Sequence, residues 1–333
     1  MKKILLIFLL LTGVFSCMNF KINTSSDSKQ ANYTPTPVEL KIPPGFPYMI
    51  IPQDNPATVE GILLGRMLFY DPIIDIDGKR FCGQCHAQET SFSCKDKCLP
   101  HINLTWNNAF LWDGKVKGVL EDIMLFEVER FFNTDLIKLN KHRGYTKLFK
   151  KAFGTETITS KEIAYALAQF VRTLISNNSK WDRVLQGSAT LTQAEKKGRD
   201  IFFSEKGDCF HCHGTILFTD NYFHNNGLDS IPDKGRAEIT KNKKDIGKFK
   251  TPTLRNIEFT APYMHDGRFA TLEEVIDFYS EGVTWSLTID PLMKKVHKGG
   301  VHLSREEKAY LLAFLKTFSD TTFLNNSNFS NPF

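Results

Sequence analysis

Cys82-Gly83-Gln84-Cys85-His86 and Cys209-Phe210-His211-Cys212-His213 are two copies of the pattern Cys-x-x-Cys-His. Two thiols three positions apart can form thioether bonds to the two vinyl groups on one edge of a haem, and the histidine that follows then offers a ring nitrogen to the iron. A zinc site would need four ligands drawn together, whereas these pairs lie far apart, each with its own histidine. A thioredoxin-type motif is the other alternative. Two copies in one chain favour two covalently bound haem c groups.

Apolar residues recur at helical intervals around both motifs, and strongly alternating strand patterns are absent. A helix followed by Cys-x-x-Cys-His occurs twice. We therefore predict a mainly α fold with two cytochrome c-like haem domains, residues 46–180 and 190–320, each able to bury its own core. The expected helices span residues 58–69, 160–174 with Ser160 as the candidate N-cap, 191–203, 272–279 and 304–318.

The first residues have the pattern of an export signal, because Lys2-Lys3 precede an apolar run that is too short for a good transmembrane helix. Cys17 directly after Ser16 resembles a bacterial lipobox. This predicts a lipoprotein signal peptide over residues 1–17, a lipid anchor at Cys17 that attaches the protein to a membrane, and a periplasmic location. Plain cleavage nearby with an incidental cysteine is the alternative. Residues 18–45 are predicted to be a flexible tether, since their first part is rich in Ser, Asn, Thr, Lys and Pro.

The 333 residues carry a net charge of +5, with basic residues scattered rather than grouped, so we expect no nucleic-acid partner. Apart from Cys17 and the two motifs, Cys94 and Cys98 remain. Free thiols are not expected to persist in an oxidising export compartment, so we expect a disulfide between Cys94 and Cys98, although their spacing alone does not establish its geometry.

Further blocks of sequence resemble the bacterial di-haem cytochrome c peroxidase family, including its MauG-like branch, over roughly residues 50–320. Chance agreement across so many ordered blocks is negligible. Besides the two motifs, the blocks are Leu64-Gly65-Arg66-Met67-Leu68-Phe69, Leu111-Trp112-Asp113-Gly114, Asp233-Lys234-Gly235-Arg236, Phe249-Lys250-Thr251-Pro252-Thr253-Leu254-Arg255-Asn256 and Thr260-Ala261-Pro262-Tyr263-Met264-His265-Asp266-Gly267-Arg268-Phe269.

The resemblance implies two haem sites with different tasks. The haem at His86 is expected to meet hydrogen peroxide, and the six-coordinate haem at His213 is expected to accept electrons from a small exported cytochrome c or copper protein. Trp112 matches the family's tryptophan between the two haems, which assists electron transfer; simple core packing is the alternative. Members of the family are often dimers, so the resemblance also implies a homodimer.

Tyr279 is the second ligand that the resemblance implies for the haem at His213, because the family places this ligand seven residues after the leucine that starts the Thr271-Leu272 helix. Conventional members have methionine at this position, and MauG-like members have tyrosine. A phenolate stabilises ferric iron and lowers its potential, whereas a thioether raises it. Met264 and Met293 are the alternative ligands.

Four more residues are assigned by the resemblance alone. The family has a histidine at the position of His265, near the second haem, where it contacts a propionate; a structural hydrogen bond is the alternative. Thr260 and Pro262 match positions whose carbonyls bind a Ca²⁺ ion between the domains, and Asn103 matches the side-chain ligand of that site. Hard oxygen ligands suit Ca²⁺.

The surroundings of the first haem depart from the family pattern. The loop after the first motif is shorter than usual, and His101 within it is either a resting ligand of the iron or a surface residue. The family's Gln and Pro after Leu-Glu are missing, which leaves the distal acid unassigned. Glu127 or Glu129 could supply the carboxylate that moves a proton between the peroxide oxygens, and both could instead be exposed.

The function that follows from the resemblance is reduction of hydrogen peroxide to water by a di-haem cytochrome c peroxidase, with electrons from a small exported redox protein. A MauG-like oxidase that modifies a partner protein is the first alternative, and Tyr279 favours it. A di-haem electron carrier without peroxidase turnover is the second, and the altered segment after Trp112 favours that one.

Overall fold

The computed structural model describes residues 33–333 apart from Asp96. The export signal, the anchor at Cys17 and most of the predicted tether lie outside the described residues. At the described end of that tether the Val38 N–H donates to the Ala57 carbonyl over 2.9 Å, which attaches this segment to the start of the helical part. None of the described helices combines the length and the apolar character needed to span a bilayer.

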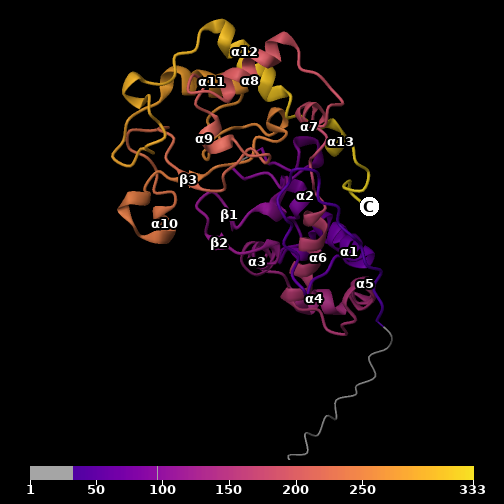
Figure 1. Cartoon of the computed structure of the whole chain (residues 1–333). Coiled ribbons are helices and arrows are strands. Elements are labelled where there is room, and N and C mark those ends of the chain that lie inside the picture. The colour runs from indigo at the N-terminus through magenta and orange to yellow at the C-terminus, as the bar shows by residue number, and fades with distance from the viewer. Residues whose placement is uncertain (1–32, 96) are drawn as a thin grey trace, which may run out of the picture. The chain divides into compact units, whose positions relative to one another are not determined.

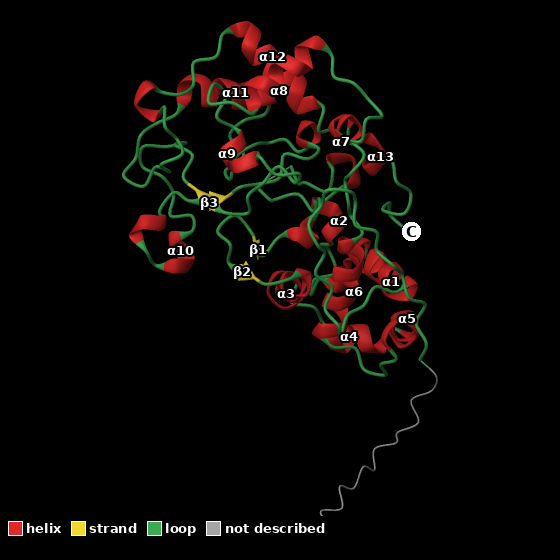
Figure 2. Ribbon diagram, in the orientation of Figure 1, coloured by secondary structure: helices red, strands yellow, loops and turns green. Residues whose placement is uncertain are grey.

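The described part of the chain is mainly helical, as predicted, with two small antiparallel sheets (Figure 2). Two helices, α3 and α11, run on into five-residue π turns, Glu127–Phe131 and Phe278–Gly282. The strands pair as β1 Ala109–Phe110 with β2 Val116–Lys117, and as β3 Phe223–His224 with β4 Phe249–Lys250. The helices are α1 Val59–Tyr70, α2 Cys82–Cys85, α3 Leu120–Phe126, α4 Leu136–Lys141, α5 Arg143–Phe153, α6 Ser160–Arg172, α7 Lys180–Leu185, α8 Gln193–Phe202, α9 Phe210–His213, α10 Ala237–Thr240, α11 Leu272–Asp277, α12 Arg305–Lys316 and α13 Thr321–Leu324.

The predicted helices are present, with their ends shifted by a few residues at most. The N-cap of α6 is Thr159 rather than the predicted Ser160. Thr159 has the extended backbone that a cap requires, its hydroxyl accepts from the Lys161 N–H over 3.2 Å, and Glu162 accepts from the Thr159 N–H over 3.0 Å. The helix expected over residues 272–279 ends at Asp277 because the next residues form the second π turn.

The first hydrophobic core is built on the crossing of α1 and α6. A Cβ atom added to Gly65 would lie 1.9 Å from the Ala166 carbonyl oxygen, so only glycine allows these helices to approach so closely. Phe69 and Phe170 are fully buried beside this contact. The C-terminal residues also pack here, since the Tyr70 hydroxyl donates to the Phe329 carbonyl over 2.8 Å.

The second hydrophobic core repeats this construction with α8 and α12. A Cβ atom on Gly198 would lie 1.9 Å from the Tyr310 carbonyl oxygen. Phe202, Phe314 and Phe318 are fully buried around it. In Figure 1, α1, α4, α5 and α6 lie together, and α8, α11 and α12 lie together. The first core also includes Phe323 and Phe329, beyond the predicted range 46–180, and the division into two haem domains stays our proposal.

A buried polar network joins the segments between the cores. The Arg255 guanidinium, with no exposed surface, donates to both carboxylate oxygens of Asp182 over 2.9 Å and to the Ser176 carbonyl over 3.2 Å. The Ser176 hydroxyl contacts Asn256 and Asp320. Because each buried charge has a partner, the network holds the chain segments of both cores in one arrangement.

Candidate haem sites

Both Cys-x-x-Cys-His motifs form a single helical turn. The His86 N–H donates to the Cys82 carbonyl over 2.8 Å, and the His213 N–H donates to the Cys209 carbonyl over 3.0 Å. The cysteine thiols of both motifs take part in no disulfide. By contrast, Cys94 and Cys98 are joined, which confirms the predicted pairing.

The two motif histidines are held in the same way. Nδ1 of His86 lies 2.7 Å from the Phe92 carbonyl oxygen, and Nδ1 of His213 lies 2.8 Å from that of Phe218. A carbonyl can only accept, so each Nδ1 carries the proton and each Nε2 keeps its lone pair for a metal. Burial lowers the pKa of His86 to about 4 and also lowers the pKa of His213, so both rings are neutral. These residues fit a haem iron.

A large cavity adjoins the second motif. The space inside it, the open mouth included, is ≈ 1600 Å³. Cys209, Cys212 and His213 line it, and most of its other lining residues are apolar. Paired thiols, a neutral imidazole and an apolar space of this size are what a covalently attached porphyrin requires, so the second site also fits haem c.

All three candidates for the second ligand at His213 line this cavity. They are Tyr279, Met264 and Met293. The Asn226 side-chain amide donates to the Tyr279 hydroxyl oxygen over 3.0 Å and lies 3.5 Å from the Met264 sulfur. Burial raises the pKa of Tyr279 to about 12, and the hydrogen bond from Asn226 opposes this rise. The hydroxyl therefore stays protonated unless a cation lies beside it.

Trp112 and His265 line the same cavity. The Trp112 indole N–H donates to the Lys97 carbonyl over 2.6 Å, and its own carbonyl accepts from the Lys250 N–H over 2.8 Å. The residue therefore connects the first half of the chain to strand β4. His265 stacks on Phe249, with ring centroids 3.6 Å apart, and its Nε2 lies 3.4 Å from an Asp233 oxygen. Both residues lie in the wall of the cavity at the second motif, and their roles stay proposals.

His101 is partly buried beside His86, and its Nδ1 atom has no contact with solvent, which argues against a surface position. The two rings stack, with centroids 3.6 Å apart and planes 16° from parallel. The role of His101 as a resting ligand of the iron stays a prediction.

The two candidate distal carboxylates lie in different environments. Glu127 is half-buried, and burial raises its pKa to about 7. Burial raises the pKa of the Cys82 thiol, and the charge of Glu127 adds to this rise. Glu129 is exposed. The role of either residue as the distal acid stays a prediction, and the partly buried position of Glu127 favours this residue.

Asn103, the predicted side-chain ligand of the calcium ion, is engaged in other contacts. The Asn103 side chain donates to the Ser176 carbonyl over 3.1 Å and accepts from the Ser176 N–H over 2.9 Å. The Thr260 hydroxyl donates to the Ile257 carbonyl over 3.3 Å. Among the described residues no hydrogen bond joins Asn103 to Thr260 or Pro262. The calcium site therefore stays a prediction.

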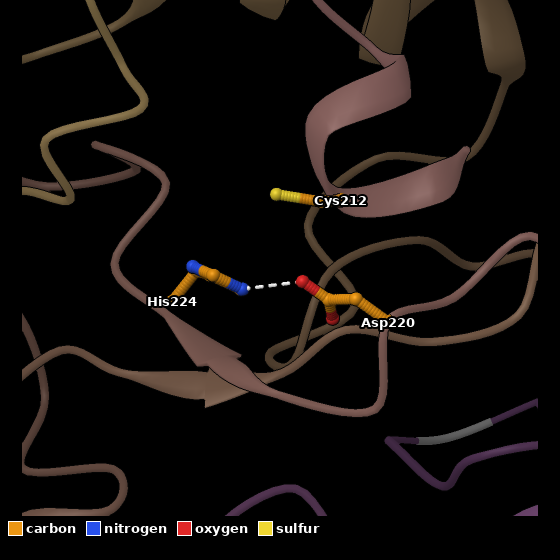
Figure 3. Close-up of side chains that lie close together, drawn as sticks. All are labelled: Cys212, Asp220 and His224. Atoms are coloured by element: carbon orange, nitrogen blue, oxygen red, sulfur yellow. Dashed lines mark hydrogen bonds and ion pairs between the residues drawn. The ribbon is translucent and has the colours of Figure 1, made fainter. Parts of the chain in front are cut away.

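One polar cluster in the cavity wall was missed by the sequence analysis. His224 donates from Nε2 to Asp220 over 2.8 Å and from Nδ1 to Asp290 over 2.7 Å, and Figure 3 shows its ring facing Asp220 near Cys212. Burial lowers the pKa of His224, but the two carboxylates outweigh it and raise the pKa to about 9. Asp220 and His224 are four positions apart, whereas nothing in the local sequence points to Asp290.

Comparisons with known proteins agree with two haem sites in this chain. Residues 59–190 match the family described as di-haem cytochrome c peroxidase. The chain is 31% identical over 314 residues to methylamine utilization protein MauG of Methylorubrum extorquens, covering 88% of this chain and 87% of that protein. It is 30% identical to cytochrome c551 peroxidase of Nitrosomonas europaea, covering 80% and 81%. A solved MauG-like protein associated with microbial copper homeostasis superposes with a TM-score of 0.81 and 33% identity, covering 89% of this chain and 99% of that one.

Proposed function

This chain belongs to the di-haem cytochrome c peroxidase family, and from that premise we propose that it is a MauG-type oxidase, which uses hydrogen peroxide to oxidise side chains of a partner protein. In the net reaction hydrogen peroxide takes up two electrons and two protons and becomes two water molecules, while the partner loses two electrons and two protons. The haem groups, when bound, supply the redox chemistry. The protein supplies their ligands, their orientation and the path between them.

The observation that carries this proposal is the position of Tyr279. Its hydroxyl lines the same cavity as Cys209, Cys212 and His213, and it accepts a hydrogen bond from Asn226. An oxygen ligand of this kind stabilises ferric iron, and a hydrogen bond from the amide favours the phenolate further. A site that favours the oxidised state suits storage of oxidising equivalents for a slow protein substrate better than steady electron supply from a donor.

The roles that we propose for the other residues follow from the contacts described above. The carbonyls of Phe92 and Phe218 hold His86 and His213 in the tautomer that binds metal. Trp112 lines the second cavity and is hydrogen-bonded to both halves of the chain. We propose it as the residue through which electrons pass from one haem site to the other.

A cytochrome c peroxidase fed by a small cytochrome c or copper protein is the second candidate. It is supported by the relative named cytochrome c551 peroxidase. It is also supported by Met264, because the thioether lies within 3.5 Å of the same Asn226 amide that contacts Tyr279. With Met264 as the ligand, the second site would favour the reduced state and accept electrons more readily.

The rate at which the purified protein with both haems attached consumes peroxide distinguishes the MauG-type oxidase from the cytochrome c peroxidase. We expect slow consumption in the presence of a reduced small cytochrome c or copper protein, and an oxidised spectrum that persists after peroxide is added alone. We expect Tyr279→Met to shorten that persistence and Tyr279→Phe to do the same. Rapid steady-state turnover with a reduced donor, unaltered in both variants, would assign the chain to the peroxidases.

Export and lipid attachment at Cys17 complete the proposal. The two partners expected, a peroxide that diffuses freely and a protein substrate, both suit a periplasmic position on a membrane. Cys17→Ala should release the protein from the membrane fraction and leave haem content unchanged. If the variant stays in the membrane fraction, the anchor is not at Cys17.

A further inference from the structure

A short loop follows the first motif and is closed at two levels. At its base the Phe92 carbonyl accepts from the His101 N–H over 3.0 Å. Near its tip a disulfide joins Cys94 to Cys98, whose Cα atoms lie 5.7 Å apart. A covalent ring of so few residues restricts the conformations of the backbone inside it. We call the segment from Phe92 to His101 the disulfide loop.

The base of the disulfide loop is hydrogen-bonded to the histidine of the first motif. The Phe92 carbonyl accepts from Nδ1 of His86 over 2.7 Å, in addition to its bond with the His101 N–H. A carbonyl oxygen has two lone pairs, so it can accept both bonds. The loop is therefore attached directly to the side chain that keeps its Nε2 lone pair for the first iron.

The tip of the disulfide loop contacts Trp112. The Lys97 carbonyl, which lies inside the ring closed by the disulfide, accepts from the Trp112 indole N–H over 2.6 Å. The N–H of the same peptide unit belongs to Cys98 and is directed at the Cys94 sulfur over 3.1 Å. In a trans peptide unit the N–H and the C=O point in opposite directions. The disulfide sulfur therefore fixes the peptide unit with its carbonyl facing the indole.

The position of Trp112 depends on contacts made by other segments. The residue before it, Leu111, has a φ of 66°, in the left-handed region that residues other than glycine rarely adopt. Such a conformation persists only where the surrounding structure holds it. The Lys250 N–H binds the Trp112 carbonyl, which fixes the backbone. Nε1 is the only polar atom of an indole, so the bond to Lys97 is the one hydrogen bond that directs the ring.

We propose that the disulfide between Cys94 and Cys98 is a positioning device for electron transfer between the two haems. It directs the Lys97 carbonyl at Trp112 and thereby holds the indole in the wall of the cavity at the second motif. One continuous set of contacts then runs from the histidine of the first site, through the disulfide loop, to the residue that lines the second site. The two cysteines belong to none of the sequence blocks that resemble the family.

This inference rests on the proposed role of Trp112 in transfer, and it holds for the oxidase and the peroxidase alike. It has a consequence for the maturation of the protein. The two thiols must be oxidised before the Lys97 carbonyl takes its place, and an oxidising export compartment is where disulfides form and persist. Full transfer rates therefore require this oxidation as well as the attachment of both haems.

The rate of electron transfer between the haems tests the proposal without peroxide or a partner protein. It is followed by absorption after a light flash has reduced one haem of the full-length protein with both haems attached. We expect the double variant Cys94→Ser with Cys98→Ser to slow this transfer several-fold and to retain both haem spectra, because serine keeps the size of the side chain but cannot form the disulfide. Lys95→Ala removes an exposed charge from the same ring and should leave the rate unaltered. A native rate in the double serine variant would overturn the proposal.

Trp112→Phe separates positioning of the indole from general damage to the fold. Phenylalanine has no N–H for the Lys97 carbonyl to accept from, so the disulfide has no ring to direct in this variant. We expect Trp112→Phe to slow the transfer, and we expect no further slowing when the two serines are added to it. An equal loss from the serines with and without Trp112 would show that the disulfide supports the fold as a whole, and it would overturn the proposal.

An ultraviolet resonance Raman spectrum reads the indole hydrogen bond directly. The chain has four tryptophans, so the signal of Trp112 is the difference between the native protein and Trp112→Phe. Loss of the disulfide should move this band toward that of an indole N–H without an acceptor. The native protein, reduced with a phosphine, alkylated and returned to the ferric state, should show the same shift, which covers the case of serine variants that fold poorly. An unchanged band would overturn the proposal.

The outcomes also separate this proposal from the proposed function. The expected rates and band shift in a protein that oxidises no partner would leave the proposal intact and remove the MauG-type function alone. A native transfer rate in Trp112→Phe would remove both the transfer role of Trp112 and the positioning role of the disulfide.

Discussion

The imidazole rings of His86 and His101 stack face to face, 3.6 Å apart at their centroids. His101 Nδ1 is buried without a hydrogen-bond partner among the described residues, and burial keeps the pKa of this ring well below its usual value. The ring therefore packs as a flat neutral group against the ring of His86.

This stack predicts that His101→Phe is mild. A phenyl ring preserves the stacking area and removes an unsatisfied polar atom, so both haems should be retained and the resting spectrum should be unchanged. The test compares the absorption and electron paramagnetic resonance spectra of the ferric variant with those of the ferric native protein. A change of spin state at one haem would mean that His101 binds iron after all.

Tyr279 predicts an asymmetric change in potential. Tyr279→Met replaces a hard oxygen ligand with a thioether. This should raise the midpoint potential of one haem and leave the midpoint potential of the other haem unchanged. A spectroscopic redox titration resolves the two haems. Met293→Leu serves as the matched control, since this residue lines the same cavity, and an unaltered titration in Tyr279→Met would remove Tyr279 as the ligand.

The buried pair of Arg255 and Asp182 predicts a large loss of stability. Arg255→Met leaves the Asp182 carboxylate, 4% exposed, without its cation, and removing one partner of a buried ion pair costs about 3–5 kcal/mol. The free energy of unfolding in urea gives the measurement. Lys150→Met breaks the exposed pair with Glu156 and should cost about 0–1 kcal/mol. Equal losses in the two variants would contradict this account.

His224 predicts that stability falls in mildly alkaline solution. The pKa of His224 is raised to about 9 in the folded state by Asp220 and Asp290, against about 6.5 in the unfolded chain. The stabilisation is therefore complete below about pH 6.5 and is lost as the pH rises through about 9. Unfolding free energies between pH 6 and 10 should show this decline in the native protein and a weaker one in His224→Gln. Parallel curves would show that the cluster is not the cause.

The glycine contact in the first core predicts strong intolerance to a methyl group. In Gly65→Ala the new Cβ would meet the Ala166 carbonyl at 1.9 Å, so α1 must shift away from α6, and overpacking of this kind costs about 1–3 kcal/mol. Gly144→Ala, in the exposed part of α5, meets a movable His142 side chain at 3.1 Å and should be neutral or stabilising. Thermal denaturation of the two variants makes the comparison, and similar melting temperatures would contradict the packing argument.

The helices could be predicted because their signals are local. Apolar spacing located α1, α6, α8 and α12 to within a few residues. The one cap that we predicted, Ser160, is Thr159 in the structure, a shift by one position between two hydroxyl residues. The motifs predicted the attachment points for the same reason. Tyr279 could be named because it lies at a fixed distance from a helix start in its own segment.

Contacts between distant segments could not be predicted in this way. The stacking of His101 on His86 depends on how a short loop folds back, and the pairing of His224 with Asp290 joins residues far apart in the chain. The π turn after α3 has no sequence signature, so the choice between Glu127 and Glu129 required the burial of each side chain. Asn103 bonds to Ser176 through a chain reversal that no local pattern encodes.

Trp112 is held at two points, by Lys250 at its backbone carbonyl and by Lys97 at its indole nitrogen. A tryptophan hydrogen-bonded at both its backbone and its ring has little freedom to reorient when an electron leaves it or arrives. For the transfer role proposed here, that rigidity means a small reorganisation energy, so the rate of exchange between the two sites would depend mainly on their separation and difference in potential.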